Sequence, residues 1–154
     1  MPKIIKFRAW HNPLQRMFYG DSQEDAEFWG AKVGASVFGT FIYAFTNLFL
    51  KNNGQLMQYI GLKDKHGKEI YEGDILQLEN NKCQIQKARI IGIVTFSFNS
   101  FAVEIKRVDI WEKYLVPPLE IDSVLYFLNL SGKELEVIGN IYENPELVKE
   151  KAND

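Results

Sequence analysis

Four carboxylates, Asp64, Glu69, Glu72 and Asp74, lie close together in the stretch LMQYIGLKDKHGKEIYEGDIL (residues 56–76). Two carboxyl groups held near one another can act as a general acid and a general base. Each of the four, however, neighbours a glycine or a lysine at a point where turn formation already accounts for it. The stretch therefore predicts structural turns rather than acid–base catalysis.

The chain has two histidines, His11 and His66, and one cysteine, Cys83. A metal site in a protein needs several such ligands at helical or hairpin spacing, and the sequence has no cluster of that kind. Both histidines stand in turn sequences, HNP and DKHG, so we interpret them as solvated turn residues. A single cysteine cannot form an intrachain disulfide, which favours a buried thiol in an intracellular protein.

Motifs for nucleotide binding and acyl transfer are also missing from the sequence. The three glycines of GLKDKHGKEIYEGD do not have the spacing of a phosphate-binding loop, and no serine lies in a G-x-S-x-G elbow. We therefore expect no catalytic, cofactor-binding or metal-binding residues, and no enzymatic activity.

Three lysines of the same stretch lie between two tyrosines, at Tyr59, Lys63, Lys65, Lys68 and Tyr71. Basic residues interleaved with aromatic ones can follow a nucleic-acid backbone and stack on its bases. Acidic residues dilute this charge, and the chain has a net charge of −2 and a pI near 5.8, unlike most nucleic-acid-binding proteins. A nucleic-acid surface at these five residues is the alternative hypothesis, and an ordinary solvated face is the favoured one.

The N-terminal portion predicts two strands and a helix. Alternating residues favour a strand over 3–10 and a second one over 16–20, joined by the HNP turn. Asp21 and Ser22 are candidate N-caps of a short helix that follows, because acidic residues fill its first turns. The sequence KNNG then separates this portion from the patterned half of the chain.

The 56–76 stretch itself predicts three short strands, over 56–62, 68–71 and 75–78. The turn DKHG separates the first two, and its Gly67 can adopt the positive φ that other residues avoid. A corner at EGD separates the second and third, with Gly73 free to adopt unusual dihedral angles. The stretch therefore reads as strand, turn, strand, corner and strand.

The remaining sequence is rich in β-branched residues and favours either two strands or one bent strand over 83–98, and single strands over 101–108 and 134–142. Gly92 is a candidate bulge that would bend the first of these. At the end, Asn144 is placed as an N-cap and Pro145 as the first residue of a short terminal helix. Several short strands with frequent turns predict a mainly β fold, a β-rich α+β protein with a small barrel or roll.

One uncharged segment, Val33–Leu50, just reaches the length of a membrane span. It contains two glycines and four hydroxyl or amide residues, and its period of two places Phe, Tyr, Phe and Phe on one face. We interpret it as a strand buried on both faces and expect no membrane insertion.

Two long motifs resemble the YopX family of phage and prophage proteins. They are LMQYIGLKDKHGKEIYEGDIL (56–76) and LEVIGNIYENPELV (135–148), and the segments KFRAW (6–10) and GIVTFSFNSFAVEI (92–105) also resemble the family. The residues that carry the signature are Gln58, Gly61, Asp64, Gly67, Ile70, Tyr71, Glu72, Gly73, Asp74, Ile138, Gly139, Asn140, Tyr142, Asn144 and Pro145.

The sequence departs from the family pattern at Ile60, where threonine is usual, and at His66, where asparagine is usual. Asparagine cannot perform the proton chemistry of histidine, which weakens any catalytic role for His66. Residues 21–53 do not match the family pattern.

The resemblance implies a YopX-like domain over 54–154 with a small SH3-like barrel. We expect it to pack with a β-rich N-terminal portion over 1–53 as one compact unit. It also implies a bacteriophage or prophage protein in the cytoplasm of a bacterial host, with no established biochemical activity and no cofactor.

The expected function is a non-enzymatic accessory role, in which the barrel binds a protein partner or a second copy of the chain. Exposed strand edges and an uneven charge favour self-association. Residues 1–100 carry 12 Lys and Arg against 9 Asp and Glu, whereas residues 101–154 carry 6 against 11.

Overall fold

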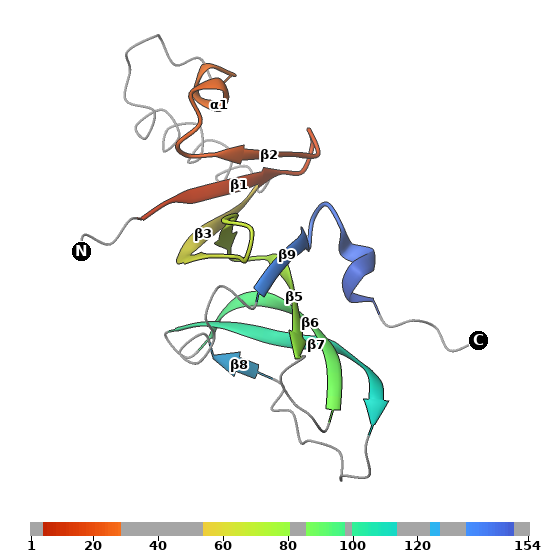
Figure 1. Ribbon diagram of the computed structural model, residues 1–154. Coiled ribbons are helices and arrows are strands. Elements are labelled where there is room, and N and C mark those ends of the chain that lie inside the picture. The colour runs from red at the N-terminus through yellow and green to blue at the C-terminus, as the bar shows by residue number, and fades with distance from the viewer. Residues whose placement is uncertain are drawn as a thin grey trace. The chain divides into compact units, whose positions relative to one another are not determined.

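The computed structural model describes residues 5–28, 54–80, 86–97, 100–113, 124–126 and 135–149 (Figure 1). The chain divides into two compact units, Met1–Gly61 and Leu62–Asp154. This division falls within strand β3 (Gly54–Lys63), whereas the sequence placed a boundary at the start of that strand. The segment Val33–Leu50 lies outside the described residues.

The first unit contains an antiparallel sheet in which β1 (Phe7–His11) pairs with β2 (Arg16–Tyr19) on one side and with β3 on the other. Strand β4 (Glu69–Tyr71) belongs to the second unit. Ala9 and Trp10 are successive residues of β1 whose side chains point to opposite faces of the sheet, and both are buried, so both faces are covered at this strand. The predicted opening strand is confirmed, although it begins at Phe7 and ends at His11.

A short helix, α1 (Gln23–Phe28), follows β2. It begins where the sequence placed an N-cap, because the Ser22 hydroxyl oxygen accepts a hydrogen bond of 3.2 Å from the Asp25 backbone N–H. Glu24 and Asp25 lie in the first turn, where acidic side chains are stabilised by the helix dipole.

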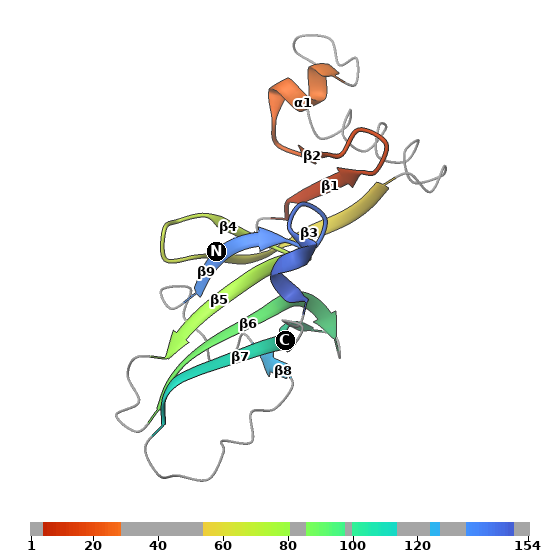
Figure 2. The same ribbon diagram turned by 90° about the vertical axis from the view of Figure 1, so that its right-hand side faces the viewer.

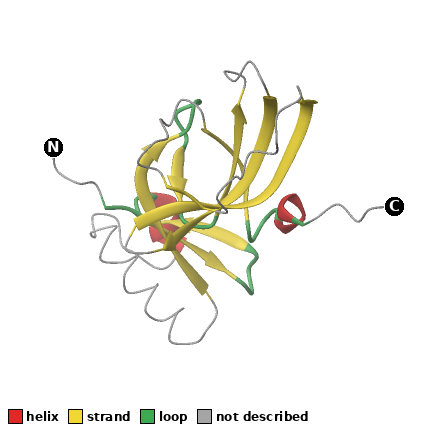
Figure 3. Ribbon diagram, turned by 90° about the horizontal axis from the view of Figure 1, so that it is seen from below, coloured by secondary structure: helices red, strands yellow, loops and turns green. Residues whose placement is uncertain are grey.

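The second unit contains a five-stranded antiparallel sheet in the order β8-β7-β6-β5-β9. Its strands are β5 (Asp74–Asn80), β6 (Gln86–Ser97), β7 (Ser100–Lys113), β8 (Val124–Tyr126) and β9 (Leu135–Asn140). Figure 2 shows β5, β6 and β7 side by side as long curved strands, so that the sheet curls into a half-barrel. Strands dominate the described residues (Figure 3), and the expectation of a mainly β fold is confirmed.

The pairing of β6 with β7 is irregular at Gly92, where the sequence predicts a bulge, but the extra residue, Lys106, lies in β7 because Ile91 pairs with Arg107 and Gly92 with Ile105. The pairing of β6 with β7 shifts register between Ile91 and Gly92. A Cβ atom at Gly92 would lie 2.4 Å from Val103 Cγ1 and 2.7 Å from the Glu104 carbonyl oxygen. Glycine is therefore required here by the close approach of β7, and residues 86–97 form one bent strand rather than two.

Strand β5 contributes buried residues on both of its faces to the core of the second unit. Ile75 and Leu76 are successive residues of this strand, so their side chains point to opposite faces of the sheet. Both side chains are almost completely buried. Full burial of such a side chain contributes roughly 2 kcal/mol to folding. The other buried apolar residues of this unit are Ile70, Tyr71, Ile91, Val94, Ala102, Val103 and Leu135.

A short helix follows β9, as predicted, but this helix is of the 3₁₀ type (η3, Pro145–Val148). Pro145 takes the expected first position. Asn144 occupies the N-cap position, as predicted, but its side chain makes no capping hydrogen bond. Among the residues that the structure describes, no helix is long and apolar enough to cross a membrane.

Candidate functional site

The turn of the 56–76 stretch is organised by the carboxylate of Asp64, which is only 7% exposed. One carboxylate oxygen, Oδ1, accepts hydrogen bonds from the backbone N–H groups of His66 at 2.8 Å and Lys68 at 2.9 Å. Gly67 closes the turn with φ +84° and donates its N–H to the Asp64 carbonyl at 3.0 Å. The turn role predicted for Asp64 and Gly67 is therefore confirmed.

The second oxygen of Asp64 reaches a distant part of the chain. Oδ2 accepts a hydrogen bond of 3.1 Å from the backbone N–H of Val137 in β9. Burial raises the pKa of the Asp64 carboxyl, but the N–H groups of Val137, Lys68 and His66, with the charge of His66, outweigh it and leave that pKa below its usual value. Asp64 is therefore a fixed anion, and its lowered pKa does not suit proton transfer at neutral pH.

The next two turn residues, Lys65 and His66, also face β9. The Lys65 backbone N–H donates to the Leu135 carbonyl at 2.9 Å, and its ammonium group lies 2.6 Å from Glu136 Oε2. His66 Nε2 lies 3.6 Å from Glu136 Oε1. The hydrogen bond from Lys65 is the main reason that the pKa of Glu136 is lowered, although partial burial opposes it. The two family-like motifs thus meet in one network.

The corner at residues 72–74 is built in the same way. The buried Asp74 accepts a hydrogen bond of 2.8 Å from the Tyr71 backbone N–H, and Gly73 has φ +79°, as the sequence predicts. Gly73 also donates its N–H to the Val94 carbonyl and accepts from the Ile141 N–H, at 2.9 and 3.0 Å. The corner therefore links β6 to the segment after β9.

The end of the second motif forms a turn around Asn140. Its side-chain oxygen accepts hydrogen bonds from the backbone N–H groups of Tyr142 and Glu143, both at 3.0 Å. The side chain of Asn144 packs against Gly139, where an added Cβ would lie 2.6 Å from Asn144 Oδ1. Polar groups of the signature are thus engaged in holding turns and strand edges.

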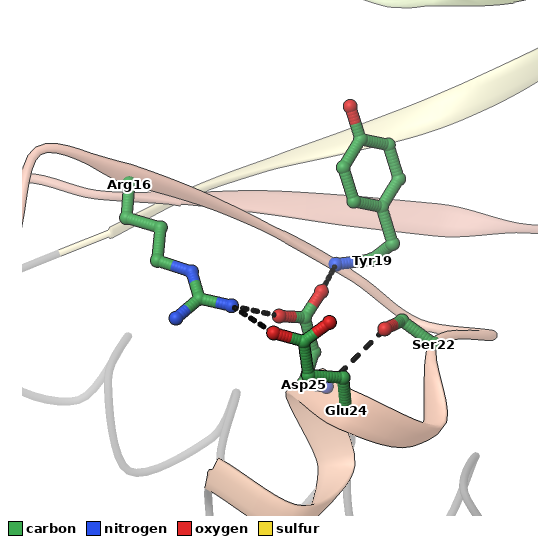
Figure 4. Close-up of polar contacts among 5 residues, drawn as sticks. All are labelled: Arg16, Tyr19, Ser22, Glu24 and Asp25. Atoms are coloured by element: carbon green, nitrogen blue, oxygen red, sulfur yellow. Dashed lines mark hydrogen bonds and ion pairs between the residues drawn. The ribbon is translucent and has the colours of Figure 1, made fainter.

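The first unit contains a separate polar cluster around Asp25, whose carboxylate is bound by Arg16 and by the Tyr19 backbone N–H (Figure 4). Its Oδ1 lies 2.7 Å from Arg16 Nη2, and its Oδ2 accepts a hydrogen bond of 2.8 Å from the Tyr19 backbone N–H. The Arg16 guanidinium also lies 4.7 Å from the centroid of the Phe18 ring. Asp25 is therefore a structural anion that ties α1 to β2.

The five residues of the candidate nucleic-acid surface differ in exposure. Tyr59 and Tyr71 are 9% and 3% exposed, and the Tyr71 hydroxyl donates to Glu69 Oε2 at 2.9 Å. Lys65 pairs with Glu136, whereas Lys63 and Lys68 have exposed side chains. Base stacking requires accessible ring faces, so these two tyrosines do not provide a stacking platform in this conformation.

The two histidines also differ. His66 is exposed, as predicted, whereas His11 is buried at the end of β1 and its Nδ1 accepts the Leu14 backbone N–H at 3.1 Å. The prediction of a solvated side chain at His11 is therefore wrong, and burial lowers its pKa. Within the described ranges, no group of three histidine, cysteine, aspartate or glutamate side chains lies close enough to hold a metal ion.

An exposed aromatic pair lies at the end of the β6–β7 hairpin. Phe96 is 57% exposed and stands directly opposite Phe101 in the strand pairing, with ring centroids 5.2 Å apart in an edge-to-face arrangement. The sequence from Ile90 to Val103 contains no charged residue. This pair is the most exposed large apolar feature described in the second unit.

Sequence reasoning missed three features of these networks. Gly61 has φ +90° inside a strand, and the only sequence feature that could have indicated this backbone angle is the glycine itself. The bonds of Asp25 to Arg16 and Tyr19, and the bond between Asp64 and Val137, join residues whose spacing carries no recognisable motif.

Comparisons with known proteins identify relatives over almost the whole chain. A family model described as "YopX protein" matches residues 6–149. No curated protein matches the chain. Among solved structures, the crystal structure of protein EF1440 from Enterococcus faecalis is similar, with a TM-score of 0.52 and 23% identity over 96% of this chain and 100% of that one. At that identity the likeness supports the fold alone.

Proposed function

Because the chain belongs to the YopX family, whose model matches residues 6–149, we propose that it is a non-enzymatic accessory protein of a bacteriophage or prophage. In this proposal it works in the cytoplasm of the bacterial host. It binds a protein partner or a second copy of itself, and it needs no cofactor.

The aromatic pair Phe96 and Phe101 is the observation that carries this proposal. An exposed phenylalanine ring contributes little to the fold, but it becomes favourable when a partner covers it, by roughly 25 cal/mol per Å² of apolar surface removed from water. Aromatic side chains in a hairpin without charged neighbours are typical of the centre of a protein interface.

The chemistry of the signature supports the same proposal. Asp64, Asp74 and Asn140 direct their side-chain oxygens to backbone N–H groups, in networks that hold turns together. Groups held in this way stabilise a scaffold, and they are poorly placed to take part in proton transfer. A binding surface elsewhere on the scaffold is consistent with that arrangement.

A capture experiment tests the proposal. The full chain, immobilised and exposed to lysate of infected host cells, is expected to retain a defined protein. Gel filtration with light scattering measures whether the chain associates with a second copy of itself. Phe96→Ser is expected to weaken that binding at least tenfold. Ile5→Ser is the matched control, because Ile5 is exposed to the same 57% in the first unit. Equal binding by both variants would remove the Phe96 surface from the proposal, and a chain that stays monomeric and captures nothing would refute the proposal itself.

Nucleic-acid binding is the second candidate function, favoured by the exposed side chains of Lys63 and Lys68 beside one turn. With Tyr59 and Tyr71 buried, such binding would rest on phosphate contacts and would weaken steeply with added salt. Titration of labelled single- and double-stranded DNA at low salt tests it, with Lys63→Ala/Lys68→Ala as the comparison. Absence of binding at low salt rules this function out.

A further inference from the structure

Two sheet edges in this protein are covered by a carboxylate in the same way. Among the strands that the structure describes, β9 is an edge of the second unit's sheet and β2 is an edge of the first sheet. The Val137 N–H of β9 donates to Asp64, and the Tyr19 N–H of β2 donates to Asp25. Both donors therefore point away from the neighbouring strand and toward a side chain.

The backbone acceptors at these edges are covered too. The Leu135 carbonyl of β9 accepts the Lys65 N–H at 2.9 Å, and the Tyr19 carbonyl of β2 accepts the Ser22 N–H at 3.2 Å. At each edge, a donor and an acceptor that could pair with another strand are bound by the residues of a nearby turn or helix start. Uncovered groups of this kind form a template for strand addition.

Both carboxylates are fixed in place before any strand could approach. Asp25 and Asp64 are 5% and 7% exposed, and burial of an anion is costly unless other groups bind it. The oxygen of Asp25 that does not face β2, Oδ1, is bound by Arg16. The oxygen of Asp64 that does not face β9, Oδ1, accepts the N–H groups of His66 and Lys68. A bond from N–H to carboxylate is also stronger than one to a carbonyl, so an incoming strand cannot displace it without loss.

We propose that Asp64 and Asp25 guard the edges of β9 and β2, and thereby prevent a second copy of this chain from adding a strand there. A second copy presents the same edge, and two identical edges can pair antiparallel about a two-fold axis. This inference is independent of the proposed function, because it states which edges are closed to assembly rather than what the protein binds.

The variant Asp64→Asn separates the guard from the turn. Its amide oxygen can still accept the N–H groups of His66 and Lys68, while its NH₂ group then faces the Val137 N–H, so that two donors oppose each other. We expect the concentration at which half of the protein is associated to fall at least tenfold relative to the unmodified chain. Light scattering after gel filtration measures the association, and hydrogen exchange at Val137 measures the exposure of its N–H.

A proline at residue 137 provides the decisive control. Proline has no N–H, and an edge strand tolerates it where the N–H does not serve the ladder. The double variant Asp64→Asn/Val137→Pro is therefore expected to return to the association of the unmodified chain. Gly61→Ala is the control for lost stability, because it leaves Asp25 and Asp64 in place. The association of Asp64→Asn and Gly61→Ala is compared under conditions in which the same fraction of each protein is folded.

The outcomes decide the proposal. The proposal is supported if Asp64→Asn associates more strongly than the unmodified chain and proline at residue 137 reverses that association. Stronger association of Asp25→Asn, through the β2 edge, also supports it. The proposal is overturned if Asp64→Asn associates no more than Gly61→Ala, or if proline at 137 leaves the association unchanged. If Asp64→Asn does not fold, Asp25→Asn alone decides by the same comparison with Gly61→Ala.

Discussion

The Asp64 carboxylate accepts a hydrogen bond from the Val137 backbone N–H at 3.1 Å, across a separation of 73 residues in the chain. Each of the two residues belongs to one of the two motifs that resemble the YopX signature. The bond joins the two motifs in space, since the turn of the first covers the edge strand formed by the second.

Replacing Asp64 with alanine should lower the free energy of unfolding by about 3 kcal/mol, because three backbone N–H groups lose a charged acceptor. Urea denaturation followed by circular dichroism measures the change. Lys63→Ala, at an exposed neighbouring position, should change stability by less than about 0.5 kcal/mol. Equal losses in the two variants would contradict the role assigned to Asp64.

The stability of the protein should depend on the charge of Asp64 at acidic pH. The pKa of this carboxyl is lower in the folded protein than in the unfolded chain, so its stabilising effect is complete above the unfolded value, near 4, and is lost as pH falls through the folded pKa. Asp64→Asn should therefore lose less stability than the unmodified chain between about pH 5 and pH 2. Parallel curves of unfolding free energy against pH would show that Asp64 is not responsible.

Gly61→Ala should destabilise the protein by about 1 to 2 kcal/mol through backbone strain alone. Gly61 has φ +90°, and an added Cβ would meet no atom within 4 Å. Gly61→Asn is the informative comparison, because asparagine tolerates positive φ better than alanine does. Thermal unfolding should therefore rank the unmodified chain first, Gly61→Asn second and Gly61→Ala third, and a reversed order of the two variants would disprove the strain explanation.

Asn140→Ala should destabilise the protein by about 1 to 2 kcal/mol and more than Asn144→Ala does. The Asn140 side chain accepts two backbone N–H groups at 3.0 Å, whereas the Asn144 side chain accepts one at 3.4 Å and does not cap the terminal helix. Sequence alone predicts the opposite emphasis, because it assigns a capping role to Asn144. Chemical denaturation of both variants distinguishes the two interpretations.

The sequence by itself determined the local features of this protein. Positive φ at Gly67 and Gly73 and the Ser22 cap were predicted and are present, and the irregularity predicted at Gly92 is present as a register shift whose extra residue lies in β7. Each depends on the backbone angles or the hydrogen bonds of residues a few positions apart, which short sequence patterns specify directly.

Only the tertiary structure decided which of these residues meet and which are buried. The bond from Val137 to Asp64, the attachment of Asp25 to β2 and the burial of His11, Tyr59 and Tyr71 all depend on strand pairing over long separations. A residue in a strand has the same local pattern whether its face is covered or open, and an edge strand has the same sequence preferences whether or not a carboxylate covers its N–H groups. For that reason the position of the Asp64 turn follows from the sequence. That the Asp64 carboxylate covers the Val137 N–H at the edge of β9 follows only from the pairing of the strands.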